Sequence, residues 1–369
     1  MGQGAPRHAT HRRLQVPQIR IGPRFSGLLE LSSRTQITRL LLLTSQPTMT
    51  SAIPLAHATA FQTAAGAVSD VPDWVSALPG LEAASRVPWQ AQADFETRSC
   101  VGTHFALTSV RVPAARQLDA SIFAERAEDA YGWLLDRLPT LETPFPIRIW
   151  NVIPGLLEPL GRLPQRYMVF NRSRFRAFSS RSGHRFETYL PTATGVGNDA
   201  NGEDLVVHCL SADRSGRPLE NPRQVPAYRY SERFGPRPPC FARATVIDVH
   251  PGDDAEPLEP TATHRERLLI GGTASVLGED SRHMGDLDAQ LVETEKNLRA
   301  LAAQVTGKDD AWHGHFAHLR VYHRREEDQA IVRRYVEERL PANQSAEYFC
   351  VDICRGELLT EIEGVFIPR

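Results

Sequence analysis

The sequence predicts an α+β fold with mixed sheets and helices packed on one face of each sheet. Its second half reads strand, strand, helix, strand, helix, strand, strand, an order in which helices return to cover one sheet. A similar pattern of strands and a helix precedes it, separated by a polar, proline-rich stretch. With 369 residues, 41% hydrophobic and 23% charged, the chain is long enough for two domains.

The first 48 residues differ in composition from the rest of the chain. They hold seven arginines, one acid (Glu30) and a short apolar run at 40–43. A basic stretch of this kind is a transit-like or a disordered segment, whereas the sequence from Met49 resembles an ordinary protein start. We expect residues 1–48 to be a disordered basic extension with no role in the fold.

The first folded half is expected at residues 49–215. Its early part is rich in alanine and proline and predicts irregular segments with one short helix. Apolar residues at helical spacing predict a helix at 115–138. Alternating patterns predict strands at 101–112, 144–154 and 202–212.

The second half is expected at residues 216–369, after a linker or loop at 213–226. Helices are predicted at 286–305 and 328–340, and a loop at 252–266. Strands are predicted at 240–249, 267–276, 315–324, 346–354 and 357–366. Gly271 and Gly272 are expected to break the second of these strands.

The last strands of the two halves show a weak internal similarity. Aligning 204–212 with 358–366 places Val207 opposite Glu361, so only the second copy has acids. This pairing indicates a degenerate duplication, although two unrelated halves explain so short a likeness equally well.

Composition excludes several classes of function. The net charge of −2 gives no reason to expect nucleic acid, and no apolar run approaches the roughly 20 residues that cross a bilayer. The five cysteines form no CxxC pair, which favours free thiols in the cytoplasm. The histidines between 313 and 323 lack a completing acid or cysteine, so we expect packed or surface histidines and no metal.

The stretch "CRGELLTEIEGVF" at 354–366 is the first candidate for chemistry. Because side chains alternate along a strand, Glu361 and Glu363 share one face, surrounded by apolar residues. They form a solvated face or pair with an arginine, or one of them points into an apolar pocket. In a pocket its pKa rises, and it becomes a general acid near neutral pH.

Two further segments carry candidate binding residues. In "YRYSERFGPRPPCFARA" (228–244), Arg243 lies within an apolar strand and needs either an internal carboxylate or an anionic substrate. In "LLIGGTASVLGEDSRHMGD" (268–286), small residues allow a ligand to approach the backbone closely, but no phosphate-binding loop is present.

Together these segments resemble a known family. "GGTASVLGEDSRHMGDLDAQLVETEKNLRAL" and the closing "LLTEIEG" are similar to the YjgF-like superfamily, in which the helix carries a Gln and a downstream "NL". The added "FGPRPPCFARA" and "RYMVFNRSRFRAF" narrow the resemblance, over most of residues 95–369, to the chorismatases. One departure is that the family pattern has "GR" after "FN", where here Ser173 precedes Arg174.

This resemblance implies two YjgF-like halves, with the active site in the C-terminal one. It implies chorismate as substrate, no metal or cofactor, and a monomer or homotrimer. Glu361, the first acid of "EIE", is implied as the acid that protonates the enolpyruvyl methylene carbon so that pyruvate is released. The implied substrate-binding residues are Tyr230, Arg237, Arg243, Gly272, Thr273, Ala274 and Arg355.

The product is implied by Cys354. Hydroxybenzoate-forming branches of the family carry a cysteine seven residues before the catalytic glutamate, and Cys354 occupies that place. We therefore expect 3-hydroxybenzoate, either alone or together with 4-hydroxybenzoate. The alternatives are hydrolysis of chorismate to a dihydroxycyclohexadiene carboxylate, or a YjgF-like imine deaminase or small-molecule binder.

Overall fold

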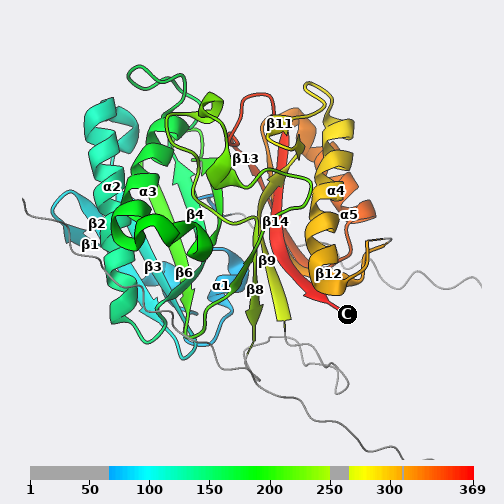
Figure 1. The fold of residues 1–369 in the computed structure, drawn as a ribbon, viewed down its shortest axis with the longest axis horizontal. Helices are drawn as coiled ribbons and strands as arrows, with labels where there is room; N and C mark the ends of the chain where they lie inside the picture. Colours follow the sequence, from blue (N-terminus) through cyan, green and yellow to red (C-terminus); the bar gives the residue numbers. More distant parts are fainter. Residues whose placement is uncertain (1–65, 250–265, 310) are drawn as a thin grey trace, which may run out of the picture. The chain divides into compact units, whose positions relative to one another are not determined.

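The computed structural model describes residues 66–249, 266–309 and 311–369, which form two six-stranded sheets and a short hairpin. The extension expected at 1–48 and nearly all of the loop expected at 252–266 lie outside the described residues. Both sheets belong to one compact unit of the chain. In Figure 1 the sheets lie next to each other, with helices on their outer faces.

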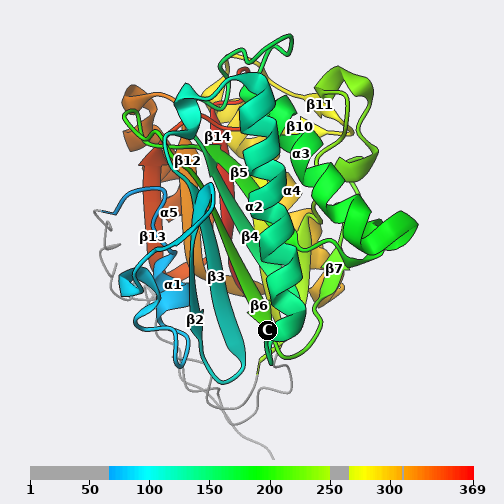
Figure 2. The same cartoon turned by 90° about the vertical axis from the view of Figure 1, so that its left-hand side faces the viewer.

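The first sheet has the strand order β1-β2-β3-β6-β4-β5, with β4 and β5 parallel and all other neighbours antiparallel. Its strands are β1 (Gln90–Gln92), β2 (Phe95–Val101), β3 (Phe105–Val112), β4 (Phe145–Ile153), β5 (Thr192–Gly197) and β6 (Leu205–Ala212). Two helices, α2 (Ala120–Arg137) and α3 (Arg166–Ser182), cover one face, as Figure 2 shows. The short helix α1 (Asp73–Ser76) precedes the sheet.

The second sheet has the order β13-β12-β14-β9-β8-β7, with β12 and β13 parallel and the rest antiparallel. Its strands are β7 (Arg217–Leu219), β8 (Ala244–Asp248), β9 (Glu266–Ala274), β12 (Gly314–His323), β13 (Ala342–Cys350) and β14 (Thr360–Pro368). Helices α4 (Leu287–Thr306) and α5 (Gln329–Arg339) cover its outer face. Strands β10 (Val276–Leu277) and β11 (Asp280–Ser281) form a separate hairpin.

The two sheets repeat one topology. Read from the β1 edge and the β7 edge, the orders β1-β2-β3-β6-β4-β5 and β7-β8-β9-β14-β12-β13 match strand for strand, including the one parallel pair in each. The last strand of each half, β6 or β14, lies in the middle of its sheet. The α+β class and the expected two similar halves are therefore confirmed.

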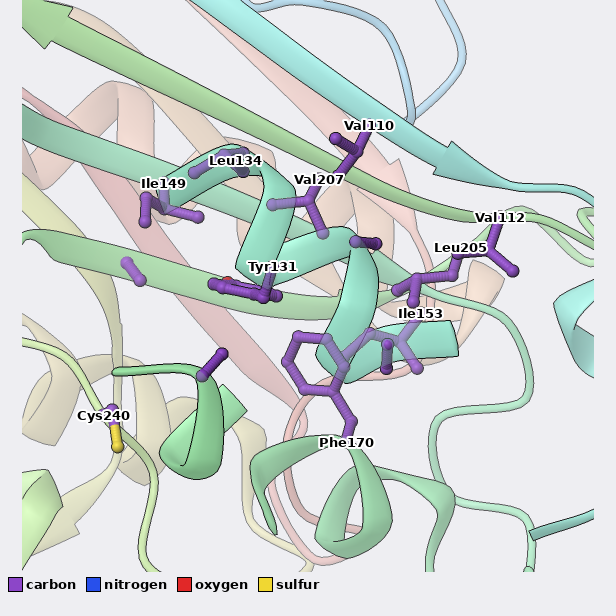
Figure 3. Close-up of a cluster of buried hydrophobic side chains, with 14 of the residues drawn as sticks. Val110, Val112, Tyr131, Leu134, Ile149, Ile153, Phe170, Leu205, Val207 and Cys240 are labelled. Atoms are coloured by element: carbon purple, nitrogen blue, oxygen red, sulfur yellow. The ribbon is translucent and has the colours of Figure 1, made fainter. Parts of the chain in front are cut away.

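Helix–sheet packing forms the outer cores. Asp119 caps α2 by accepting hydrogen bonds from the amides of Ser121 and Ile122, so the helix begins later than the apolar spacing suggested. Figure 3 shows Tyr131 of α2 and Phe170 of α3 among the strand side chains of the first core. The second outer core joins α4 and α5 to the second sheet in the same way.

The inner faces of the sheets pack on each other. One cluster contains Trp150 of β4 and Leu210 of β6 together with Leu269 of β9 and Val365 of β14. Inward-facing residues of β14 therefore meet the first half, not water. This placement decides what surrounds the two glutamates of the last strand.

Several predicted elements were wrong in detail. Strand β9 continues through Gly271 and Gly272, although its register against β14 shifts at these residues, and the Gly271 amide donates to the Arg243 carbonyl on the other side. The expected linker at 213–226 contains β7. The strand expected at 346–354 instead spans Ala342–Cys350. Helix α3 and strands β1, β2 and β5 were not predicted.

Candidate active site

A cavity lies between the two halves. Strand β5 and helix α3 line it from the first half, and β9, β14 and the loops before β8 and β14 line it from the second. Its charged lining residues are Arg174, Arg243, Arg355 and Glu361, its sulfur-bearing ones are Met168 and Cys354, and its aromatic ones are Tyr167, Tyr230, Phe234 and Phe241. The cavity thus combines cations, one acid and flat apolar walls.

Glu361 is the acid of this cavity. It is the second residue of β14, between Tyr322 of β12 and Ala274 of β9, and only 3% of its surface is exposed. Among the described residues it has no ion-pair partner. Burial, and secondly the negative charge of Glu363, raise the pKa of Glu361 from 4.5 to about 7. The side chain is thus poised to donate a proton near neutral pH.

Cys354 lies beside this carboxyl group. Its Sγ donates to Oε2 of Glu361 over 3.6 Å. The loop that carries it is attached to β5: Ile353 forms a β-bridge with Val196, and the Gly197 amide donates to the Asp352 carbonyl at 2.6 Å. Burial and the nearby Glu361 raise the pKa of the Cys354 thiol, which keeps it protonated and able to donate.

Glu363 shares the inward face with Glu361 but has a different environment. Its Oε2 accepts from Arg148 at 2.7 Å and its Oε1 from the Trp150 indole at 2.7 Å, both on β4 of the first half. The sequence left open whether these glutamates pair with an arginine or point into a pocket. Glu363 forms the internal ion pair. Glu361 is the glutamate that points into the pocket.

The small residues of β9 divide between two faces. Gly272 and Ala274 line the cavity. A Cβ atom on Gly272 would overlap the Glu361 carboxyl group, so the absence of a side chain makes room for the acid. Thr273 lies between them, is buried, donates to the Gly271 carbonyl, and does not line the cavity. Strand alternation turns it to the other side of the sheet.

Two of the predicted arginines reach the cavity. Arg243 directly precedes β8, not within it as expected, and donates to the Tyr230 hydroxyl at 2.5 Å and to the Val225 carbonyl at 3.2 Å. Its buried Nε has no hydrogen-bond partner in the structure. Arg355 stacks on Phe234, 4.0 Å from the ring centroid. In the described part of the chain neither guanidinium pairs with a carboxylate.

Arg237 is not brought to the cavity. The turn that carries it leaves the side chain exposed and stacked on Phe175, 5.1 Å from the ring centroid. Gly235, with a φ of 120°, starts this turn against Met168. Tyr230, by contrast, lines the cavity and accepts the bond from Arg243.

Arg174 is a cavity residue that was not proposed from the sequence. It lies on α3, is 1% exposed, and donates to Asn171 Oδ1 at 3.0 Å, while its buried Nε has no hydrogen-bond partner within the described residues. No carboxylate pairs with it among the described residues. Helical spacing contained the signal, because Tyr167, Asn171 and Arg174 recur at intervals of four and three along one face of "RYMVFNRSRFRAF".

Neither a metal cluster nor a membrane helix is found where the chain is described. No group of three or more His, Cys, Asp or Glu side chains is placed to hold a metal ion. His318, one of the histidines considered from sequence, is buried and hydrogen-bonded to Glu347 and Ser345. No described helix is long and apolar enough to cross a bilayer.

Fold and site together define a duplicated α+β protein with a cavity between its halves that is lined by arginines, aromatic side chains and one buried acid. Residues 85–211 match the family described as chorismatase FkbO/Hyg5-like, N-terminal. The chain is 32% identical over 288 residues to a chorismatase of Streptomyces rapamycinicus, covering 75% of this chain and 80% of the relative.

A 3-hydroxybenzoate synthase of Streptomyces hygroscopicus is 34% identical over 253 residues, which cover 66% of this chain and 69% of that protein. A chorismatase crystal structure superposes with a TM-score of 0.61 at 27% identity, covering 76% of this chain and 80% of the other. The chain belongs to the chorismatase family of enzymes.

Proposed function

We propose that this chain cleaves the enolpyruvyl ether of chorismate, releasing pyruvate and a hydroxybenzoate, with 3-hydroxybenzoate as the main product. The observation that carries the proposal is Glu361, a buried carboxyl group without an ion-pair partner in the described residues, facing a cavity of unpaired arginines. Membership of the chorismatase family and the relative named 3-hydroxybenzoate synthase support it.

The charges of the cavity suit a dianion. A buried guanidinium without a counter-ion is costly, and a carboxylate that accepts two parallel N–H bonds compensates for this cost. Arg174, Arg243 and Arg355 are three such groups. We infer that they bind the two carboxylates of chorismate, with Tyr230 orienting Arg243, while the aromatic walls contact the ring. Arg237 and Thr273 have no place in this arrangement.

Glu361 is the proposed proton donor. With a pKa of about 7, roughly half of the molecules hold the proton at neutral pH, whereas an ordinary glutamate holds almost none. Transfer of the proton to the methylene carbon of the enol ether leaves positive charge on the ether carbon and oxygen. The carboxylate that remains is negative and stabilises that centre electrostatically.

Both halves contribute to the proposed site. Residues 216–369 form the half that carries the acid, and residues 49–215 supply Arg174 and the strand under Gly272. Cys354 is proposed to direct the product, because its thiol occupies the space beside the acid that a hydrolytic water would need. Hydrolysis to a dihydroxycyclohexadiene carboxylate is the alternative outcome for the same site.

The test is incubation of the purified protein with chorismate, with coupled detection of pyruvate and chromatographic identification of the aromatic products. We expect pyruvate and hydroxybenzoate in equal amounts. Glu361→Gln, which keeps the shape but has no acidic proton, should abolish both. Absence of pyruvate with the wild-type protein would exclude the chorismatase activity and leave an imine deaminase or a binding protein.

A further inference from the structure

Glu363 and Arg148 form a buried ion pair directly behind the proposed acid. We propose that the two act as positioning residues for Glu361: Glu363 keeps the Arg148 guanidinium away from Glu361 and so allows Glu361 to retain its proton. The inference rests on the proposed function, because the proton matters only if Glu361 donates it. It goes further by giving the second acid of "EIE" a separate task.

The contacts of Arg148 show how firmly it is held. Nη2 donates to Glu363 Oε2 at 2.7 Å and to Thr194 Oγ1 at 2.5 Å, and Nη1 donates to the Ile149 carbonyl at 2.9 Å. The guanidinium lies over the Trp150 ring, whose indole N–H occupies the other oxygen of Glu363. Both charged side chains are at most 4% exposed. Each oxygen of Glu363 thus has a donor.

The network reaches Glu361 through the backbone of β9. Thr194 Oγ1 also accepts from the Gly272 amide at 2.9 Å, and Gly272 is the residue whose missing side chain makes room for the Glu361 carboxyl. Between Ile362 and Gly364 the register of β14 against β9 shifts by a bulge. At this shift Gly271 and Gly272 of β9 both lie opposite Glu363, so the extra residue of the bulge is on β9, whereas β14 stays in regular register with β12 at this point.

The charges that act on Glu361 come from several elements. Arg243, before β8, and Arg148, on β4, favour its ionised form, as does the bond from Cys354. Burial and Glu363, on β14 itself, favour the protonated form. Tyr167 of α3 also faces Glu361, and the pKa of its hydroxyl is raised, so it stays neutral. Ala274, the neighbour of Glu361 on β9, has no charge.

Without the charge of Glu363, the remaining charges favour the ionised form of Glu361 over the protonated form. Arg148 would remain buried, and Glu361 would be the nearby carboxylate available to it. An opposite charge close to a carboxyl group lowers its pKa by about 1–3 units. Glu361 would then be ionised at neutral pH and would no longer protonate carbon.

The first experiment is the pH dependence of kcat. Since the proton donor must be protonated, activity falls as pH rises through the Glu361 pKa. In Glu363→Gln we expect this descending limb to move at least about one unit to lower pH. In the double variant Glu363→Gln/Arg148→Met, which has neither charge, the limb should return towards the wild-type position. If the limb does not move in Glu363→Gln, the inference is wrong.

Glu347→Gln is the matched control. Glu347 is also a buried carboxylate of the second sheet paired with an arginine, Arg320, but its charge is not among those acting on Glu361. The Glu347→Gln variant should leave the descending limb of the pH profile in place, even if it lowers the stability of the fold. Thermal melting identifies variants that do not fold. If Glu363→Gln does not fold, Glu363→Asp replaces it. The shorter side chain weakens the ion pair with Arg148, so the descending limb should move in the same direction.

A second readout separates this inference from the proposed function. The infrared C=O stretch of the protonated Glu361 carboxyl, assigned by its absence in Glu361→Gln, is titrated without substrate in wild type and Glu363→Gln. A lower titration midpoint in Glu363→Gln supports the inference even if the wild type releases no pyruvate from chorismate. An unchanged midpoint overturns it even if the wild type does release pyruvate.

Discussion

The Cys354 thiol donates a hydrogen bond to Oε2 of Glu361, seven positions later in the chain, over 3.6 Å. The loop returns to the start of β14 because Ile353 and Asp352 are held by β5 of the other half. The proposed acid and the residue proposed to direct its product are therefore in contact, and the contact depends on both halves.

The first prediction concerns this contact. Cys354→Ala removes the sulfur beside Glu361 and leaves a space lined by polar groups in which a water molecule can bind. We expect pyruvate release to continue, with the product shifted from hydroxybenzoate towards the dihydroxycyclohexadiene carboxylate. Chromatography of the products measures the ratio. An unchanged ratio would show that Cys354 does not direct the product.

The second prediction concerns the stability contributed by Glu361. Its pKa is raised from 4.5 to about 7, so the folded protein keeps a proton that the unfolded chain releases in this window. The contribution of Glu361 to the free energy of unfolding of the wild type therefore falls as pH rises from 4.5 to 7. Glu361→Gln has no ionisable group at this position and should not show this decrease. Above pH 7 it should therefore be more stable than the wild type, by on the order of 3 kcal/mol.

Urea unfolding at pH 4.5 and pH 8 measures this difference, which should be small at the lower pH. Glu347→Gln is the control with the opposite sign. Hydrogen bonds and charges from His318 and Arg320 outweigh burial and lower the pKa of Glu347 to about 2, so its charge stabilises the fold above pH 4.5. Its variant should be less stable than wild type at pH 8. If Glu361→Gln and the wild type are equally stable at pH 8, Glu361 is not a buried, unpaired acid with a raised pKa.

The third prediction concerns Gly272. A methyl group at this position overlaps the Glu361 carboxyl group and displaces it. Because misplacement of a reacting group by about 1 Å costs roughly 100-fold in rate, Gly272→Ala should lower kcat by about that factor. Gly356→Ala is the control, since the nearest atom to its new methyl group, a Leu157 methyl carbon, is 4.0 Å away. Equal activity of the two variants would argue against this packing.

The fourth prediction concerns Arg174. Replacing it with lysine keeps the charge but removes the planar pair of donors, which should raise KM for chorismate about tenfold or more. Arg176 on the same helix is exposed and pairs with Glu128 at the surface, so Arg176→Lys should leave KM unchanged. Melting temperatures check that Arg174→Lys is folded. A wild-type KM in that folded variant would remove Arg174 from the binding site.

Site residues that belong to a local sequence pattern could be predicted, and those that depend on neighbouring segments could not. Period-two alternation placed Glu361 and Glu363 on one face, and the structure confirms this, because alternation is a local property of an extended chain. Alternation did not reveal that β9 continues through Gly271 and Gly272, because the bulge opposite Glu363 and the bond from the Gly271 amide to the Arg243 carbonyl depend on neighbouring segments. Arg174 was missed because arginines are dense along α3 and conceal its buried face.

By itself the sequence determined the α+β class, the order of elements in the second half and the strand that carries the acids. These follow from local periodicity. The family resemblance already pointed to Glu361, but only the tertiary structure gave the physical difference between the two glutamates, because the partners of Glu363 come from the other half. Arg148 of β4 neutralises Glu363 and Trp150 hydrogen-bonds to it, while no cation pairs with Glu361 in the part of the chain that is described. Charge compensation is a long-range property, and no spacing along one strand encodes it.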